Sequence, residues 1–170
     1  MATALDSPRQ LDLVAEARRQ WEQRWGPEPA LPMAAVTSIM RVQQLLMAEL
    51  NALLKPLDLT FPRYEALMLL AFASRGSMPL GKVGERLQVH RTSVTNIVDQ
   101  LERSGYVRRI PHADDRRAVL AEITDSGRRA AAAATDAMHA AGFALEGADR
   151  DDLETLVAVL DGVRERAGDF

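Results

Sequence analysis

The pattern of apolar and polar positions predicts a chain built mainly of helices. Apolar residues recur at intervals of three and four along most of its length, which places them on one face of a helix. Ser7-Pro8 has the form of a helix start, Gly26-Pro27-Glu28-Pro29 is expected to end that first helix, and Thr60 and Thr124 are expected caps of later ones. Asp149 is expected in the first turn of the last helix, where the helix dipole favours acidic residues. The predicted helices cover roughly residues 8–25, 33–55, 61–74, 80–87, 91–104, 124–145 and 149–166.

Two short segments between the fifth and sixth predicted helices have a different pattern. Residues 106–111 and 117–123 are typical of short strands, and residues 112–116 join them as the tip of a hairpin. A helix, a tight link, a second helix and a hairpin are the parts of a winged helix-turn-helix. We therefore expect a mainly α fold with a small β-hairpin wing, in which a winged helix-turn-helix domain sits on a helical base.

Charge is distributed unevenly, although the net charge of the 170 residues is only −3. Residues 80–120 contain 8 basic and 5 acidic residues, whereas residues 121–170 contain 5 basic and 11 acidic ones. A basic middle in an acidic chain favours an anionic partner that binds there, although an ordinary solvated surface is the alternative. The chain has no cysteine, which excludes disulfides, thiol nucleophiles and cysteine-based zinc sites.

The second helix of the predicted helix-turn-helix has an exposed side suited to the major groove of DNA. Its first turns carry small hydroxyl and amide side chains, with an arginine at each end. Asparagine pairs with adenine, arginine pairs with guanine, and serine or threonine donates to bases or phosphates. The alternative is a polar solvated face with ordinary caps. The candidate DNA contacts on this helix are Arg91, Thr92, Ser93, Thr95, Asn96 and Arg103.

Four charges, two acidic and two basic, stand together at the predicted hairpin tip. Arg117 is our candidate for the adjacent minor groove, where the potential is most negative. Asp115 is expected to orient that arginine, and Arg116 to contact phosphate together with Arg103, while Asp114 is expected to be a turn residue. The alternative is a solvated turn whose charges neutralise one another.

Residues 33–166 resemble the MarR (multiple antibiotic resistance regulator) family of bacterial transcription factors. The most specific stretch is DRRAVLAEIT, residues 115–124, which is similar to the family's wing signature, with Ile123 in place of the common leucine. Leu59-Thr60, the segment from Val89 to Val98 and the stretch LERSGYV at residues 101–107 are similar as well. Arg91 departs from the small residue or proline often found at its position.

The resemblance implies a homodimer that binds a pseudo-palindromic operator on double-stranded DNA through two winged domains. The apolar surface of the terminal helices agrees with this, because it exceeds what one small domain needs. We expect a sequence-specific transcriptional regulator, a repressor, whose two recognition helices lie about one DNA turn, ~34 Å, apart. The expected divisions are an N-terminal extension with an added helix at 1–32, a helical dimerisation region at 33–58 and 124–170, and the winged helix-turn-helix DNA-binding domain at 59–123.

Many members of the family release DNA when a small, often phenolic, anion binds between the dimer base and the DNA-binding lobe. Arginines would hold a carboxylate there and methionines would supply an adaptable apolar lining, although the methionines are equally explained as core. The added first helix with Trp21 loosely resembles the urate-responsive subgroup, which adds a purine-like effector to the candidates. The candidate ligand residues are Trp21, Met40, Arg41, Gln44, Met47, Arg63, Tyr64 and Met68.

Other classes of function have little support in the sequence. We find no nucleophile elbow, phosphate-binding loop or dinucleotide fingerprint, so we expect no enzyme, and the three histidines lack metal-binding spacing, so we expect no metal and no cofactor. The first ten residues lack the blocks of a signal peptide and no apolar run reaches ~18 residues, so we expect a cytoplasmic protein with no membrane partner. The remaining alternative is a winged-helix protein-interaction module without specific DNA binding, which would show a shallow salt dependence.

Overall fold

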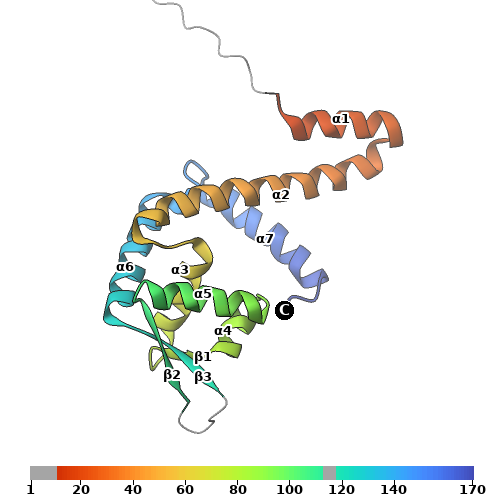
Figure 1. Cartoon of the computed structure of the whole chain (residues 1–170). Helices are drawn as coiled ribbons and strands as arrows, with labels where there is room; N and C mark the ends of the chain where they lie inside the picture. The colour runs from red at the N-terminus through yellow and green to blue at the C-terminus, as the bar shows by residue number, and fades with distance from the viewer. Residues whose placement is uncertain (1–10, 113–117) are drawn as a thin grey trace, which may run out of the picture. The chain divides into compact units, whose positions relative to one another are not determined.

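The computed structural model describes residues 11–112 and 118–170 of the chain (Figure 1). It divides into two compact units, Met1–Ala48 and Glu49–Phe170. The predicted Ser7-Pro8 helix start and the hairpin residues Asp114, Asp115, Arg116 and Arg117 lie outside the described residues. No helix in the described part of the chain is long and apolar enough to cross a membrane.

The first unit contains α1 (Leu13–Trp25) and most of α2 (Pro27–Leu54). Helix α1 begins at Leu13, because the Asp12 carboxylate accepts hydrogen bonds from the amides of Val14 and Ala15, both at 3.0 Å. The prediction that α2 begins near Met33 was wrong.

Only Gly26, at φ 90°, separates α1 from α2. Pro27 and Pro29 occupy the first turn of α2, where an amide hydrogen would lack a helical partner in any case, so they begin the helix instead of preventing it. Pro32 lies inside the same helix.

The second unit surrounds one core with short helices and a small sheet. Its largest fully buried side chains come from α2, α3, α4, α5, α6 and the sheet, whereas α7 has no buried residue. These helices are α3 (Phe61–Phe72), α4 (Leu80–Leu87), α5 (Arg91–Arg103), α6 (Asp125–Ala140) and α7 (Arg150–Arg166), with 3₁₀ turns at Lys55–Leu57 and Gly142–Ala144.

The two predicted caps, Thr60 and Thr124, both stand directly before their helices, but only Thr124 makes the capping hydrogen bond. The side chains of Thr124 and Asp149 accept hydrogen bonds from the first-turn amides of α6 and α7. The Thr60 side chain makes no such bond, and Asn51 accepts from the amide of Phe61 at 2.8 Å instead. The α6 helix ends at Ala140, short of the predicted residue 145, because the backbone turns left-handed from Gly142.

The wing is a three-stranded antiparallel sheet with strand order β1-β3-β2. The predicted hairpin is formed by β2 (Val107–Pro111) and β3 (Val119–Ile123), with Arg109 opposite Ala121. Strand β1 (Ser77–Pro79) was not predicted, because three residues are too few to show alternation, and it pairs with the other edge of β3. The fold is therefore mainly α with a small β wing, as predicted.

Candidate nucleic-acid interface

Helix α5 presents one apolar face to the core and one polar face to solvent. Val94, Ile97, Val98 and Leu101 are buried. Because an α-helix repeats every 3.6 residues, the positions between them point outward. The exposed residues are Arg91, Thr92, Ser93, Thr95, Asn96, Glu102 and Arg103.

The first turn of α5 is held by a histidine cap that sequence reasoning missed. His90 Nδ1 accepts a hydrogen bond from the Thr92 amide at 3.3 Å and lies 3.2 Å from Thr92 Oγ1. The ring nitrogen of His90 satisfies one of the amides at the helix start that lack a partner within the helix. The position of His90 directly before the predicted helix is the sequence feature that could have indicated this cap.

The candidate contacts on α5 differ in whether their side chains already form hydrogen bonds within the protein. Thr95 Oγ1 donates to the Arg91 carbonyl at 3.2 Å, and Arg103 Nε donates to the Asp99 carbonyl at 3.4 Å. Within the described part of the chain, no hydrogen bond engages the side chains of Ser93 or Asn96. The donors and acceptors of these two side chains are therefore available to an external partner.

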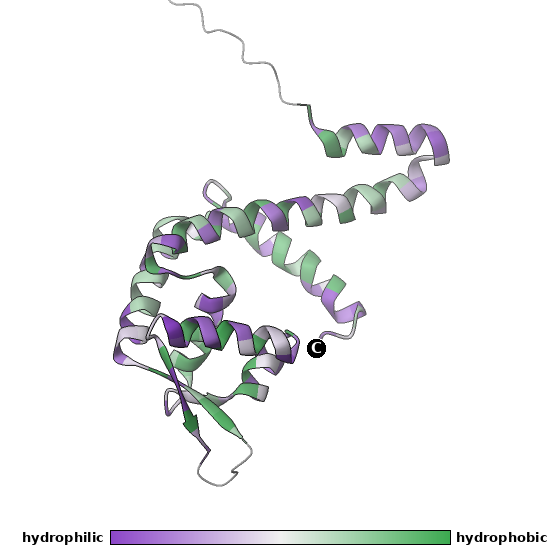
Figure 2. Ribbon diagram, viewed as in Figure 1, coloured by the Kyte–Doolittle hydropathy of each residue, from purple (hydrophilic) through white to green (hydrophobic). Residues whose placement is uncertain are grey.

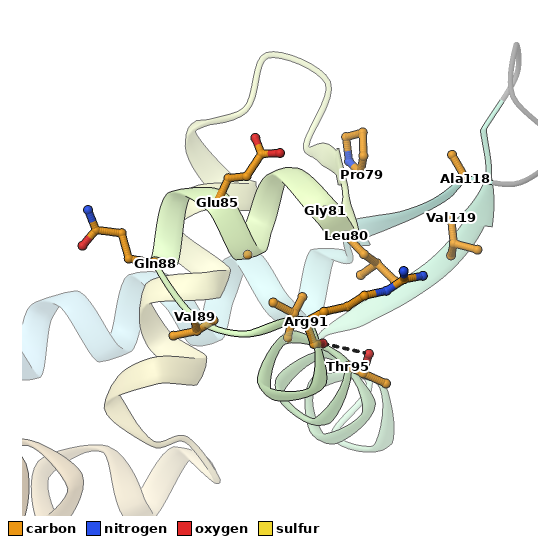
Figure 3. A pocket seen from close by; sticks show the side chains of 12 residues that line it. Pro79, Leu80, Gly81, Glu85, Gln88, Val89, Arg91, Thr95, Ala118 and Val119 are labelled. Atoms are coloured by element: carbon orange, nitrogen blue, oxygen red, sulfur yellow. Dashed lines mark hydrogen bonds between the residues drawn. The ribbon is translucent and has the colours of Figure 1, made fainter. Parts of the chain in front are cut away.

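A hollow of about 720 Å³ adjoins the start of α5 (Figure 3). Helix α4, the first turns of α5 and the beginning of β3 line it. Its walls are mainly apolar, from Leu80, Val89, Val94 and Val119, and the Arg91 side chain extends along it toward the wing. The candidate recognition helix and the wing therefore flank one recess.

An acid–base cluster lies at the other end of α5. The Arg109 guanidinium on β2 is hydrogen-bonded to the carboxylates of both Asp99 and Glu102, and its amide donates to Glu102 Oε1 at 3.1 Å. Partial burial lowers the pKa of Arg109, but the bonds to the two carboxylates outweigh it and the net pKa is raised. The guanidinium therefore remains charged.

The structure divides the candidate ligand residues between the two units. The first unit contains Trp21, Met40, Arg41, Gln44 and Met47. Trp21 packs against Trp25 there, with ring centroids 4.4 Å apart and the ring planes tilted by 45°. Arg41 lies close to Gln44, at 3.4 Å from guanidinium to amide oxygen.

The other candidate ligand residues, Arg63, Tyr64 and Met68, lie on α3 in the second unit. The Thr135 hydroxyl of α6 connects two of them, at 3.1 Å from the Tyr64 hydroxyl and 3.5 Å from the Met68 sulfur. Tyr64 is buried, so in this unit it contributes to the packing of α3 on α6.

Comparison with known proteins identifies relatives of one kind. A family model described as MarR family matches residues 59–119. The crystal structure of Sco5413, a MarR family transcriptional regulator from Streptomyces coelicolor, is 50% identical, with a TM-score of 0.76 over 82% of this chain and 96% of that one.

Two further relatives are more distant. The uncharacterized HTH-type transcriptional regulator YfiV of Bacillus subtilis (strain 168) is 30% identical over 73 residues, which span 43% of this chain and only 44% of that protein. The structure of CouR from Rhodococcus jostii RHA1, bound to p-coumaroyl-CoA, is 25% identical with a TM-score of 0.63, over 74% of this chain and 87% of that one.

Proposed function

This chain belongs to the MarR family of transcriptional regulators, and on that premise we propose that it binds a pseudo-palindromic DNA operator as a homodimer and represses transcription. The observation that carries the proposal is the first half of α5, which exposes Arg91 and the unengaged side chains of Ser93 and Asn96. Small polar side chains of this kind enter a major groove without steric conflict and pair with base edges. Thr92 and Thr95 complete the proposed base-proximal set.

The wing supports the same proposal. Strands β2 and β3 lead from α5 to the hairpin tip, which contains two arginines, and a winged protein uses such a tip in the neighbouring minor groove. We assign Arg117 to that groove with Asp115 as its orienting partner, and Arg116 and Arg103 to phosphates. Each of these assignments is inferred from the sequence and can be tested by replacing the residue.

Replacement of Arg117 by alanine is expected to weaken operator binding by roughly 1–3 kcal/mol without unfolding the protein, because it removes a directed DNA contact. The measurement is a fluorescence-anisotropy titration of labelled operator, with the unfolding transition recorded in parallel. Arg150→Ala, which removes a side chain that is 88% exposed from α7, is the control for the loss of one positive charge. Equal affinity of Arg117→Ala and wild type would refute the role of the wing.

The homodimer proposal rests on unpartnered apolar side chains. In α7, Leu156, Val157, Val159 and Val163 are exposed. Figure 2 shows hydrophobic segments along this helix. Exposed apolar surface of this extent is typical of an interface between copies of a chain. Sedimentation of the purified protein at micromolar concentration tests the dimer directly.

We also propose that a small amphipathic anion releases the protein from DNA. The CouR relative, with its bound p-coumaroyl-CoA, supports an acidic aromatic or acyl effector. The proposed contacts are Trp21, Met40, Arg41, Gln44, Met47, Arg63, Tyr64 and Met68. A ligand that favours a dimer with the wrong spacing of its two DNA-binding lobes lowers DNA affinity by shifting the population of conformations.

Binding of such an effector is expected to shift the tryptophan fluorescence of the protein, since Trp21 is proposed to line the site. Titration with phenolic acids, their coenzyme A thioesters and purines provides the measurement. Trp21→Phe retains Trp25 as a second emitter and is expected to lose the shift. A panel that leaves both the emission and the DNA affinity unchanged would contradict the effector proposal.

The function itself is tested by selection from a random duplex library, followed by sequencing of the bound fraction. The expected product is a palindrome whose half-sites lie about one helical turn apart. Binding should weaken with salt with a log–log slope near −0.9 per phosphate contacted. A folded dimer that enriches no sequence would instead favour the protein-interaction alternative.

A further inference from the structure

The exposed face of α5 is not uniformly suited to DNA. Asp99 follows Thr95 by four residues and Asn96 by three, so the helical repeat places it on the same stripe as the base-proximal candidates. Glu102 lies one turn further along, and the side chains of the two acids are 46% and 41% exposed. A pair of carboxylates at this place opposes the approach of phosphates, because like charges repel over the ~8 Å screening length at physiological salt.

Arg109 engages both carboxylates from a neighbouring strand. It lies two residues after the buried Val107, so the alternation of β2 directs both toward the same face of the sheet. Only 26% of the Arg109 side chain is exposed, and its guanidinium bonds one carboxylate with each of its two terminal nitrogens. The adjacent Arg108 is 68% exposed and pairs with Glu122 on β3, away from α5.

We propose that Arg109 is a positioning residue of the DNA interface, which acts by neutralising Asp99 and Glu102 on the exposed face of α5. The inference rests on the proposed DNA-binding function. Figure 2 shows strongly hydrophilic residues in the C-terminal half of α5, the half that leads to β2. The arginine acts through its positive charge. The cluster of Asp99, Glu102 and Arg109 has a net charge of −1, whereas the two carboxylates without Arg109 have a net charge of −2.

The proposal predicts that removing Arg109 is harmful only while the acids are present. Arg109→Ala is expected to weaken binding of the selected operator about tenfold at low salt, because two uncompensated carboxylates then face the DNA backbone. The triple variant Arg109→Ala, Asp99→Asn, Glu102→Gln is expected to recover most of this loss. Arg109→Lys, which retains the charge but not the two-nitrogen geometry, is expected to bind almost as tightly as wild type.

A purely structural role for Arg109 predicts the opposite pattern. If the arginine served only to fasten β2 to α5, the triple variant would remain as weak as Arg109→Ala, and Arg109→Lys would be weak as well. Arg108→Ala is the matched control, because it removes the same charge from the next residue of the same strand. Its loss of affinity should be clearly smaller than that of Arg109→Ala.

The experiment is an anisotropy titration of each full-length variant against the selected operator at two salt concentrations. Recovery by the triple variant supports the proposal, while absence of recovery, or an Arg109→Ala loss no larger than that of Arg108→Ala, overturns it. If Arg109→Ala fails to fold, the double variant Asp99→Asn, Glu102→Gln decides: it should bind at least as tightly as wild type, and a tenfold loss overturns the proposal. A wild-type protein that binds no duplex refutes the proposed function itself, which distinguishes the two failures.

Discussion

Replacement of Gly127 by alanine is expected to destabilise the winged-helix unit by about 3 kcal/mol. Gly127 is buried in the first turn of α6, and a Cβ there would lie 2.1 Å from the Tyr106 carbonyl oxygen and 2.9 Å from Ile123 Cγ1. Helix propensity alone favours alanine over glycine by ~1 kcal/mol, so the sign of the effect depends on whether this contact can relax.

The contact at Gly127 has little freedom to relax. The Tyr106 carbonyl accepts a hydrogen bond from the Thr124 amide at 3.0 Å, and the Thr124 hydroxyl in turn accepts from the Gly127 amide at 3.0 Å. Moving the carbonyl away would therefore break the connection between β2 and the start of α6. Backbone, unlike a flexible side chain, cannot move aside cheaply in a packed interior.

The free energy of unfolding of the Gly127→Ala variant is to be measured by chemical denaturation at fixed protomer concentration, since association contributes to apparent stability. Gly81→Ala is the matched control, because Gly81 lies in α4 with no atom within 4 Å of the added Cβ. That change should leave stability between unaltered and ~1 kcal/mol higher. Similar curves for the two variants would contradict the steric argument.

Truncation of Leu67 to alanine is expected to cost about 2–5 kcal/mol. Leu67 has no exposed surface and lies on α3, the helix that contacts α4, α5, α6 and strands β1 and β3. Loss of its side chain removes buried apolar area and leaves a cavity that the surrounding elements cannot fill without moving. Because the helices of the candidate DNA interface pack on α3, the recognition helix should lose rigidity as well.

Phe72 on the same helix provides the control for Leu67. Its side chain is larger but the residue is 78% exposed, so Phe72→Ala should change stability by no more than ~0.5 kcal/mol. Denaturation curves of both variants, with amide exchange of the α5 backbone, are the measurements. A greater loss for Phe72→Ala than for Leu67→Ala would show that burial within the chain is not what decides stability here.

Local pattern was a good guide where the relevant partners are close in sequence. Helix α5 could be predicted with its buried and exposed faces because both follow from the helical repeat within thirteen residues. The Thr124 cap could be predicted as well, because its side chain reaches an amide only three residues away. The start of α2 was wrongly predicted at Pro27 and Pro29, because proline stops a helix in its interior but begins one in its first turn.

Most of the helices, the hairpin strands and the polar face of α5 therefore follow from the amino-acid sequence alone, because periodicity and capping act over a few residues. Tertiary packing was needed to show that β1 adds to β3, that Asn51 caps α3, and that Arg109 pairs with two acids of α5. Each of these contacts joins residues of two different elements. Many other pairings between elements would be compatible with the same local pattern. The physical reason is that a charge or an amide can pair with any complementary group of the chain, and packing selects which one lies within reach.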